Sequence, residues 1–165
     1  MAIFKPREIL NIFTDLDGEK YKELGYDTIF LDIDNTIAIP DTGGCDDRAR
    51  EFIYKLQDLD YKVVIFSNNT KKRVEMFIGD LKVDYTYWSL KPLPFKYWMT
   101  CSKLKTKPSR TLVLGDQLMT DILGANLSGC TGIYCKKLQD KDTPITKFNR
   151  FFENLVWRYI LHEKV

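Results

Sequence analysis

Short apolar runs alternate with longer amphipathic stretches along the chain. The apolar runs lie at residues 28–33, 62–66, 84–88, 110–114 and 131–134, and each has the length and composition of a buried strand. Strands that alternate with helices are typical of a parallel sheet covered on both faces. We therefore expect an α/β fold, a three-layer Rossmann-like arrangement in which helices flank a parallel sheet.

Helical periodicity follows the first, second and fourth of these runs. Apolar residues recur there three or four positions apart, which places them on one face of a helix. They are Ala49, Phe52, Ile53, Leu56 and Leu59, then Val74, Phe77, Ile78 and Leu81, then Leu118, Ile122 and Ala125. Each gap has room for about one loop and one helix, which leaves no space for a large cap domain. A single domain over residues 1–165 is expected.

Composition is that of an ordinary globular protein. Hydrophobic residues make up 44% and charged residues 29%, and the longest apolar run is too short to cross a bilayer. The first residues lack an apolar stretch followed by a signal cleavage site, so a cytoplasmic location is expected. The formal charge of +2 gives only a weak bias towards anionic partners, and no nucleic-acid partner is expected.

Cysteine and histidine chemistry is not indicated. Cys45, Cys101, Cys130 and Cys135 form no C-x-x-C pair, and no paired histidines accompany them to complete a zinc site. We expect four reduced thiols without a catalytic role. The only histidine, His162, lies close to the end of the sequence, which argues against a mechanism built on a Ser-His-Asp or Cys-His arrangement.

Two aspartates follow the first predicted strand. In an open parallel sheet, ligands bind beyond the carboxyl ends of the strands. Alternation along an extended chain places Asp32 and Asp34 on the same side. Two close carboxylates repel one another unless a cation or a proton lies between them. A hard cation with oxygen ligands, most naturally Mg²⁺, would satisfy this requirement.

Polar residues also follow the next three strands. Ser67 and Asn68 precede a helix start, where backbone N–H groups favour an anion. Lys91 follows the third strand, and Asp116 and Asp121 follow the fourth. Taken singly, an aspartate usually caps a helix or forms a turn, and a lysine is usually solvated. Their order on successive strand ends favours one shared site instead.

Four motifs in this order resemble those of the haloacid dehalogenase (HAD) superfamily of phosphatases. The motifs are DIDNT at 32–36, SN at 67–68, KP at 91–92 and GDQLMTD at 115–121. Within that superfamily the chain resembles the YqeG-type group of subclass IIIA, whose members resemble mitochondrial phosphatidylglycerophosphate phosphatases. That similarity extends over 66–77, 115–129 and PITKFNR at 144–150. Leu90 and Lys147 depart from the usual pattern, which leaves substrate preference open.

The resemblance implies a role for each motif residue. Asp32 would attack phosphorus and become an aspartyl-phosphate, while Asp34 would act first as acid and then as base. Mg²⁺ would be held by the carboxylates of Asp32 and Asp116 and by the backbone carbonyl of Asp34, with Asp121 in support. The remaining residues would bind phosphate oxygens or support the Asp34 loop: Ser67, the N–H groups near Asn68 and Lys91 for the phosphate, Thr36 for the loop.

Aromatic and basic residues mix near both ends of the chain. Such a mixture suits a membrane interface, although packing on the sheet is the more usual role of an amphipathic segment. The residues concerned are Phe148, Arg150, Phe151, Phe152, Leu155, Trp157, Arg158, Tyr159 and Ile160, and also Ile9, Leu10, Ile12 and Phe13. Peripheral membrane contact therefore stays open for both segments.

The leading hypothesis is a Mg²⁺-dependent phosphomonoester hydrolase that acts on a lipid head group, with phosphatidylglycerophosphate as the candidate from the resemblance. One alternative is a non-catalytic binding or scaffolding protein with the same fold, and another is a phosphatase of soluble or protein phosphoesters. A phosphoacceptor signalling domain is a further alternative. Such domains lack a base two residues after the acceptor, where this chain has Asp34.

Overall fold

A six-stranded parallel sheet forms the centre of the computed structural model, which describes residues 2–139 and 156–158. The strands are β1 (Glu8–Leu10), β2 (Thr28–Leu31), β3 (Lys62–Phe66), β4 (Asp84–Thr86), β5 (Thr111–Gly115) and β6 (Thr131–Cys135). Their spatial order is β1-β6-β5-β2-β3-β4, and every pair is parallel. The predicted parallel α/β sheet is confirmed.

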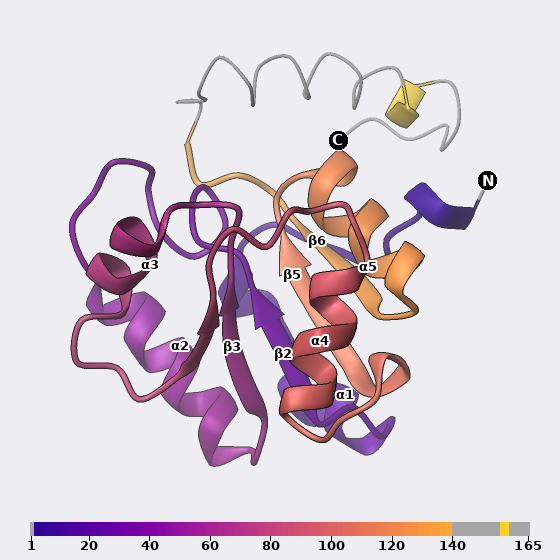
Figure 1. The fold of residues 1–165 in the computed structure, drawn as a ribbon, viewed down its shortest axis with the longest axis horizontal. Helices are drawn as coiled ribbons and strands as arrows, with labels where there is room; N and C mark the ends of the chain where they lie inside the picture. The colour runs from indigo at the N-terminus through magenta and orange to yellow at the C-terminus, as the bar shows by residue number, and fades with distance from the viewer. Residues whose placement is uncertain (1, 140–155, 159–165) are drawn as a thin grey trace.

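Helices cover both faces of the sheet (Figure 1). They are α1 (Gly18–Glu23), α2 (Asp47–Asp58), α3 (Lys71–Ile78), α4 (Phe95–Lys103) and α5 (Leu123–Ser128), with shorter turns η1 (Ala2–Phe4), η2 (Phe13–Asp15), η3 (Pro108–Arg110) and η4 (Leu118–Ile122). Strand residues alternate between two cores: Ile29 and Leu31 pack with α1, α2 and α3, whereas Phe30 packs with α4 and α5. The result is the predicted three-layer arrangement.

The predicted helical faces are buried. Within α2 and α3 the predicted apolar positions line the core, and Leu81 beyond α3 is buried as well. Side chains cap both helices, because Asp46 accepts from the N–H of Ala49 at 2.8 Å and Thr70 accepts from the N–H of Arg73 at 3.3 Å. After β5 the helix begins as the π-helical turn η4 and continues as α5.

The loops that follow β2 and β3 hold no cap domain. Residues 32–46 and 67–70 are all described, and neither loop contains a helix or a strand of its own. Since an inserted domain would need many more residues than these loops offer, the expected absence of a large cap is confirmed.

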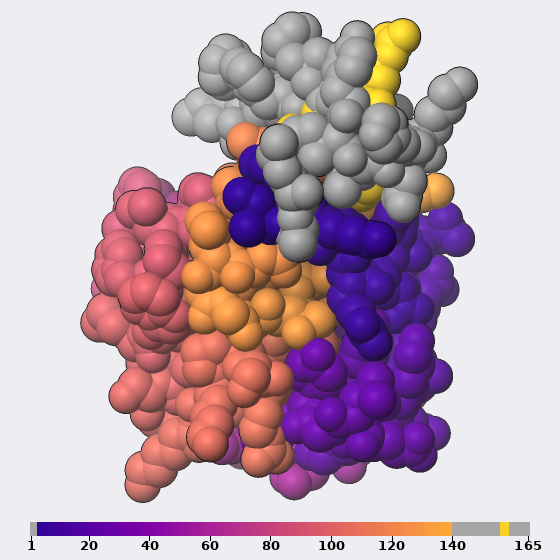
Figure 2. Space-filling model, turned by 90° about the vertical axis from the view of Figure 1, so that its right-hand side faces the viewer, coloured from indigo at the N-terminus to yellow at the C-terminus, as the bar shows by residue number. Residues whose placement is uncertain are grey.

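The N-terminal segment adds a strand that the hydrophobic pattern did not predict. The N–H of Arg7 donates to the carbonyl of Gly132 at 2.8 Å, and β1 then pairs with β6. Asn126 donates to the carbonyls of Ile3 and Lys5, and Figure 2 shows the N-terminal residues lying against the residues of this distant part of the chain. Leu10 and Phe13 are buried, whereas Ile9 is partly exposed. Most of this segment therefore packs on the sheet.

Two strands end earlier than predicted. β2 ends at Leu31 because the chain turns immediately afterwards, and the carbonyl of Ile33 accepts from the N–H groups of residues 36, 37 and 38. β4 ends at Thr86, and Trp88 takes a left-handed backbone conformation with φ of 46° that interrupts the strand. Asp32 and Asp34 therefore lie on a loop rather than on a strand.

Near the C-terminus, the structure describes residues 156–158. Val156 and Trp157 are buried against η4 and β6, and the Trp157 ring meets the Tyr134 ring edge to face at 5.2 Å. These two residues pack on the core. The PITKFNR segment at 144–150 and the predicted aromatic residues outside 156–158 lie beyond the described residues.

The cysteines and the helices of the described residues also agree with the sequence. Cys45, Cys101, Cys130 and Cys135 are free thiols, as predicted. Within residues 2–139 and 156–158, no helix combines the length and apolar character needed to cross a membrane.

Candidate active site

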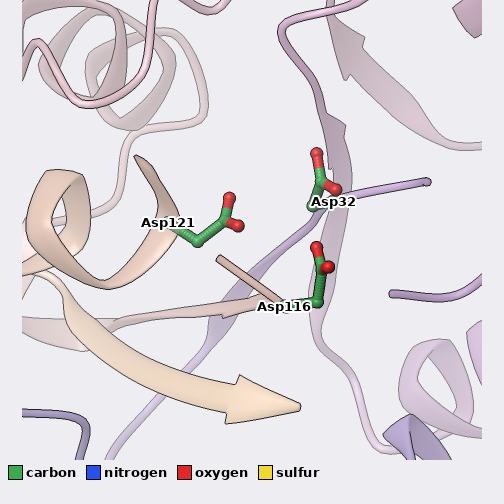
Figure 3. A group of neighbouring side chains, drawn as sticks. All are labelled: Asp32, Asp116 and Asp121. Carbon is green, nitrogen blue, oxygen red and sulfur yellow. The ribbon is translucent and has the colours of Figure 1, made fainter. Parts of the chain in front are cut away.

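Three buried aspartates converge at the carboxyl edge of the sheet (Figure 3). Asp32 follows β2, Asp116 follows the neighbouring strand β5, and Asp121 lies in η4. One carboxylate oxygen from each lies within 4.8 Å of the others. Figure 3 shows Asp121 extending from the helical turn towards the two strand-end residues. The fold thus brings together three of the acids that the sequence singled out.

A glycine and an irregular helical turn allow Asp121 to reach this group. A Cβ atom on Gly115 would collide with the side chain of Asp121, so the close approach requires glycine at the end of β5. The N–H of Gln117 donates to Oδ2 of Asp121 at 3.1 Å and fixes that carboxylate. The surrounding π-helical turn is a rare element that often occurs at functional sites.

Lys91 joins two of these acids. Its Nζ lies 2.6 Å from Oδ1 of Asp32 and 2.6 Å from Oδ1 of Asp121, and it also donates to the carbonyl of Phe66 at 3.2 Å. Burial alone would lower the pKa of Lys91, but the carboxylates of Asp121 and Asp32 outweigh burial and raise that pKa above its ordinary value. The side chain is therefore a buried ammonium.

The nucleophile candidate Asp32 has an unusual environment. Burial, together with the nearby Asp121 carboxylate, raises the pKa of Asp32 to about 6, even though the Lys91 ammonium opposes that shift. Thr36, which is fully buried, donates from its hydroxyl to Oδ1 of Asp116 at 3.2 Å and lies 3.5 Å from Oδ2 of Asp32. Thr36 thus contacts the acid cluster directly.

The side chain of Asn68 organises the loop that carries Lys91. Its Oδ1 accepts from the N–H of Lys91 at 2.8 Å and from the hydroxyl of Ser89 at 2.8 Å, while its Nδ2 donates to the carbonyl of Lys91 at 3.2 Å. Ser67 is buried, and its Oγ accepts from the backbone and side-chain N–H groups of Asn69. Phosphate binding by Ser67 and by the N–H groups near Asn68 stays a prediction.

Asp34 is held apart from the three buried acids. Its Oδ2 accepts from Nδ2 of Asn69 at 2.7 Å, and its Oδ1 accepts from the guanidinium of Arg73 at 2.7 Å. Arg73 also donates to the carbonyl of Gly43 at 3.2 Å, which ties α3 to the loop after β2. The Asp34 side chain is 29% exposed. Among the predicted residues, it is the acid best placed to meet a ligand from outside.

Asn69 and Arg73 were missed as site residues. One signal could have drawn attention to Arg73, although it applies equally to Lys71 and Lys72: all three lie in the first turn of α3, where the helix dipole disfavours a cation unless a nearby anion compensates. For Arg73 the compensating anion is Asp34. No comparable signal marks Asn69, because its contact depends on how the loop after β2 turns.

The donor set fits a hard divalent cation. Lys91 supplies a single positive charge to a group of three buried carboxylates. Like charges at this separation need a counter-charge, and carboxylate oxygens are the ligands that hard divalent cations prefer. Asp32, Asp116 and Asp121 could therefore hold such an ion, directly or through bound water.

A buried aspartate cluster at the carboxyl edge of a parallel α/β sheet is compatible with a hydrolase site, and the family comparison identifies the class of protein. The family model for haloacid dehalogenase-like hydrolases matches residues 6–129, and the chain belongs to this family. The resemblance seen in the four motifs is confirmed, and so is the expectation of an enzyme.

Among individual relatives, the "Probable phosphatase YqeG" of Bacillus subtilis is 31% identical over 153 residues, which cover 93% of this chain and 89% of that protein. The fold resembles a solved structure of an uncharacterised protein from Listeria monocytogenes, with a TM-score of 0.57, 18% identity and coverage of 72% of this chain and 85% of that one. These likenesses agree with the expected YqeG-type group and with the fold.

A second structural neighbour is the cobalt-bound deoxy-D-mannose-octulosonate 8-phosphate phosphatase of Haemophilus influenzae. It has a TM-score of 0.56 and 13% identity, and the match covers 81% of this chain and 88% of that one. At this identity the likeness establishes the fold alone. Family membership and the similarity to YqeG are the findings that support a phosphatase.

Proposed function

We propose that the chain is a Mg²⁺-dependent phosphomonoester hydrolase that acts through an aspartyl-phosphate on Asp32. The observation that carries the proposal is the group formed by Asp32, Asp116 and Asp121 with the Lys91 ammonium between two of them. A bound Mg²⁺ would be held by Asp32 and Asp116, with Asp121 in support, and would offset the repulsion between the nucleophile and a phosphate dianion. The whole chain would act as one catalytic domain.

Residues of the chain would carry out the attack on phosphorus and bind the phosphate. A carboxylate oxygen of Asp32 attacks phosphorus in line, the P–O bond to the leaving alcohol breaks, and a mixed anhydride forms. The Lys91 ammonium, Ser67 and the N–H groups near Asn68 hold the non-bridging oxygens, whose charge persists through the transition state. Thr36 keeps the Asp32 and Asp116 carboxylates in place through its hydroxyl.

Asp34 would transfer a proton in each of the two steps. In the first step its carboxyl group gives a proton to the leaving alcohol, and in the second it removes a proton from the water that attacks the aspartyl-phosphate. Water then takes the phosphoryl group, and Asp32 returns to its free form. The exposure of Asp34 supports this division of labour, because a ligand can reach its carboxyl group, and the hydrogen bonds from Asn69 and Arg73 fix the position of that group.

The proposed substrate is phosphatidylglycerophosphate, and the proposed location is the cytoplasm with peripheral contact to a membrane. Support comes from the similarity to the YqeG-type group and from the absence of a cap domain in loops 32–46 and 67–70. Without a cap, nothing inserted at these loops would enclose a small metabolite. A substrate whose bulk stays outside the site fits this arrangement best.

Phosphate release from two substrates tests the proposal. We expect the purified chain to release phosphate from p-nitrophenyl phosphate and, faster, from phosphatidylglycerophosphate in mixed micelles. EDTA should abolish both activities and added Mg²⁺ should restore them. Activity on the soluble ester alone would favour a phosphatase of soluble or protein phosphoesters. Absence of turnover on both, with Mg²⁺ present, would favour the non-catalytic alternative.

Replacing Arg73 by methionine should impair the transfer of a proton to poor leaving groups. The guanidinium fixes Asp34 Oδ1 at 2.7 Å, so its loss lets the acid take unproductive positions. We expect kcat on an alkyl phosphate to fall by about 10- to 100-fold, with a smaller fall on p-nitrophenyl phosphate, whose leaving group needs no proton. KM should change little, and lysine at this position should restore part of the loss.

Arg50→Met is the matched control for this substitution. Arg50 forms a similar ion pair with Asp80 at 2.8 Å, on the surface of α2 and away from the acid cluster. Loss of the Arg50 guanidinium should leave the hydrolysis of both substrates as fast as in the wild type. In Arg73→Met, equal losses on alkyl and aryl phosphates in the rate at which the aspartyl-phosphate forms would indicate a purely structural role and contradict the positioning of Asp34.

A further inference from the structure

An exposed apolar surface borders the candidate active site. Trp88, Leu90, Leu93 and Phe95 are 53%, 44%, 54% and 39% exposed, and we call these four residues the apolar rim. They belong to the segment between β4 and the first turn of α4, which passes along the carboxyl edge of the sheet in Figure 1. Large apolar side chains gathered on a surface usually mark an interaction site.

Backbone contacts connect the apolar rim to the catalytic candidates. Leu90 directly precedes Lys91, whose Nζ contacts Asp32. The N–H of Trp88 donates to the carbonyl of Asn69 at 3.0 Å, and the side chain of Asn69 holds Asp34. A partner that covers the rim would therefore lie beside the point where a phosphate ester reaches the site.

Lysines outnumber acids in the segments that carry and adjoin the rim. Residues 67–78, after β3, hold Lys71 and Lys72 beside one acid, Glu75, which pairs with Lys71 at 3.6 Å, and residues 87–99, after β4, hold Lys91, Lys96 and no acid. Arg73 and Lys91 are already paired with carboxylates of the candidate site, which leaves Lys72 and Lys96 as the main source of positive charge here. The side of the molecule that carries the rim should attract an anionic surface.

We propose that the apolar rim inserts into the interface of a bilayer that contains anionic lipid, and so presents a lipid phosphate ester to Asp32. The inference rests on the proposed function and adds the surface through which it would operate. Tryptophan and other apolar side chains beside lysines are the composition that the interfacial region of a membrane favours. Each lysine or arginine close to an anionic leaflet strengthens the attraction.

Other classes of partner fit the rim less well. Protein interfaces are depleted in lysine, whereas Lys71, Lys72 and Lys96 lie in the segments beside the rim. Binding to single-stranded nucleic acid relies on rings that stack with bases; Trp88 and Phe95 carry such rings, but the equally exposed Leu90 and Leu93 do not. An anionic lipid surface accounts for the aliphatic residues, the aromatic residues and the charge together.

Vesicle flotation with the full chain tests the rim directly. Vesicles of about three parts phosphatidylcholine to one part phosphatidylserine supply the anionic surface. The rim variant is Leu93→Ser with Phe95→Ser. The matched control is Leu24→Ser with Tyr54→Ser, because these residues, one directly after α1 and the other on α2, are 57% and 43% exposed. Thermal unfolding of each variant establishes that it is folded.

Wild type and control should bind these vesicles, and the rim variant should bind at least about tenfold more weakly because two apolar insertions are lost. Binding should weaken as salt rises or phosphatidylserine is omitted. A wild type that does not bind, a rim variant that binds normally, or an equal loss in the control would overturn the proposal. Capture of RNA or a stable dimer through the rim, without vesicle binding, would overturn it too.

The same preparations separate this inference from the proposed function. If the protein releases phosphate from soluble esters but does not bind vesicles, the proposed docking surface is refuted and the proposed hydrolase activity stands. If the protein binds vesicles but releases phosphate from no ester, the proposed docking surface stands and the proposed hydrolase activity is refuted.

Discussion

Asparagine in place of Asp32 should abolish phosphate release without unfolding the protein. The amide has nearly the shape of the carboxylate but cannot attack phosphorus, so turnover of p-nitrophenyl phosphate should fall at least about 10³-fold. The amide oxygen can still accept from Lys91, as Oδ1 of Asp32 does at 2.6 Å. Acid quenching during turnover of a radiolabelled phosphate ester should recover hydroxylamine-sensitive label on the wild type and none on the variant.

Two other variants make this result specific. Asp58→Asn makes the same chemical change at an exposed position of α2 and should leave activity and labelling unchanged. Asp34→Asn should still become labelled by an ester with a good leaving group but should lose the label slowly, because the base for the second step is missing. Substantial turnover by Asp32→Asn would refute Asp32 as the nucleophile.

The centre of the sheet was predictable because its strands are almost entirely apolar. β2, β3 and β5 are buried on both faces, and such strands appear in the sequence as short continuous hydrophobic runs. β1 gives no such signal: it has three residues, lies at the edge and begins with Glu8. Its pairing with β6 depends on contacts across the whole chain, which no local pattern records.

The meeting of the acids was predictable for a topological reason. Parallel strands end at the same edge of a sheet, and β2 and β5 are neighbours, so the residues after them must come close together. The conformations of the connecting segments were not predictable in this way. Whether Asp34 faces Asp32 or Arg73 depends on the turn at residues 33–38, where Asn35 has φ of 63°. Tertiary contacts fix that turn.

Burial of Lys91 is the feature of the site that runs most strongly against expectation from sequence, and it leads to a prediction about stability. Methionine at this position keeps most of the apolar part of the side chain but removes the ammonium between Asp32 and Asp121. Buried carboxylates then lose their counter-charge, which should cost roughly 3–5 kcal/mol of unfolding free energy in EDTA. Urea titration followed by circular dichroism measures this loss.

Mg²⁺ should return more stability to Lys91→Met than to the wild type. Removing a fixed cation from the site increases its affinity for a divalent cation, and ligand that binds only the folded state raises the unfolding free energy. Activity should stay about 10²- to 10³-fold lower even with Mg²⁺, because the ammonium that stabilises the transferring phosphoryl group is gone. Lys72→Met, at an exposed position of α3, should change neither property. If Lys91→Met were as stable as wild type in EDTA, the buried acids would not need the lysine as their counter-charge, and the electrostatic basis of the proposed site would fail.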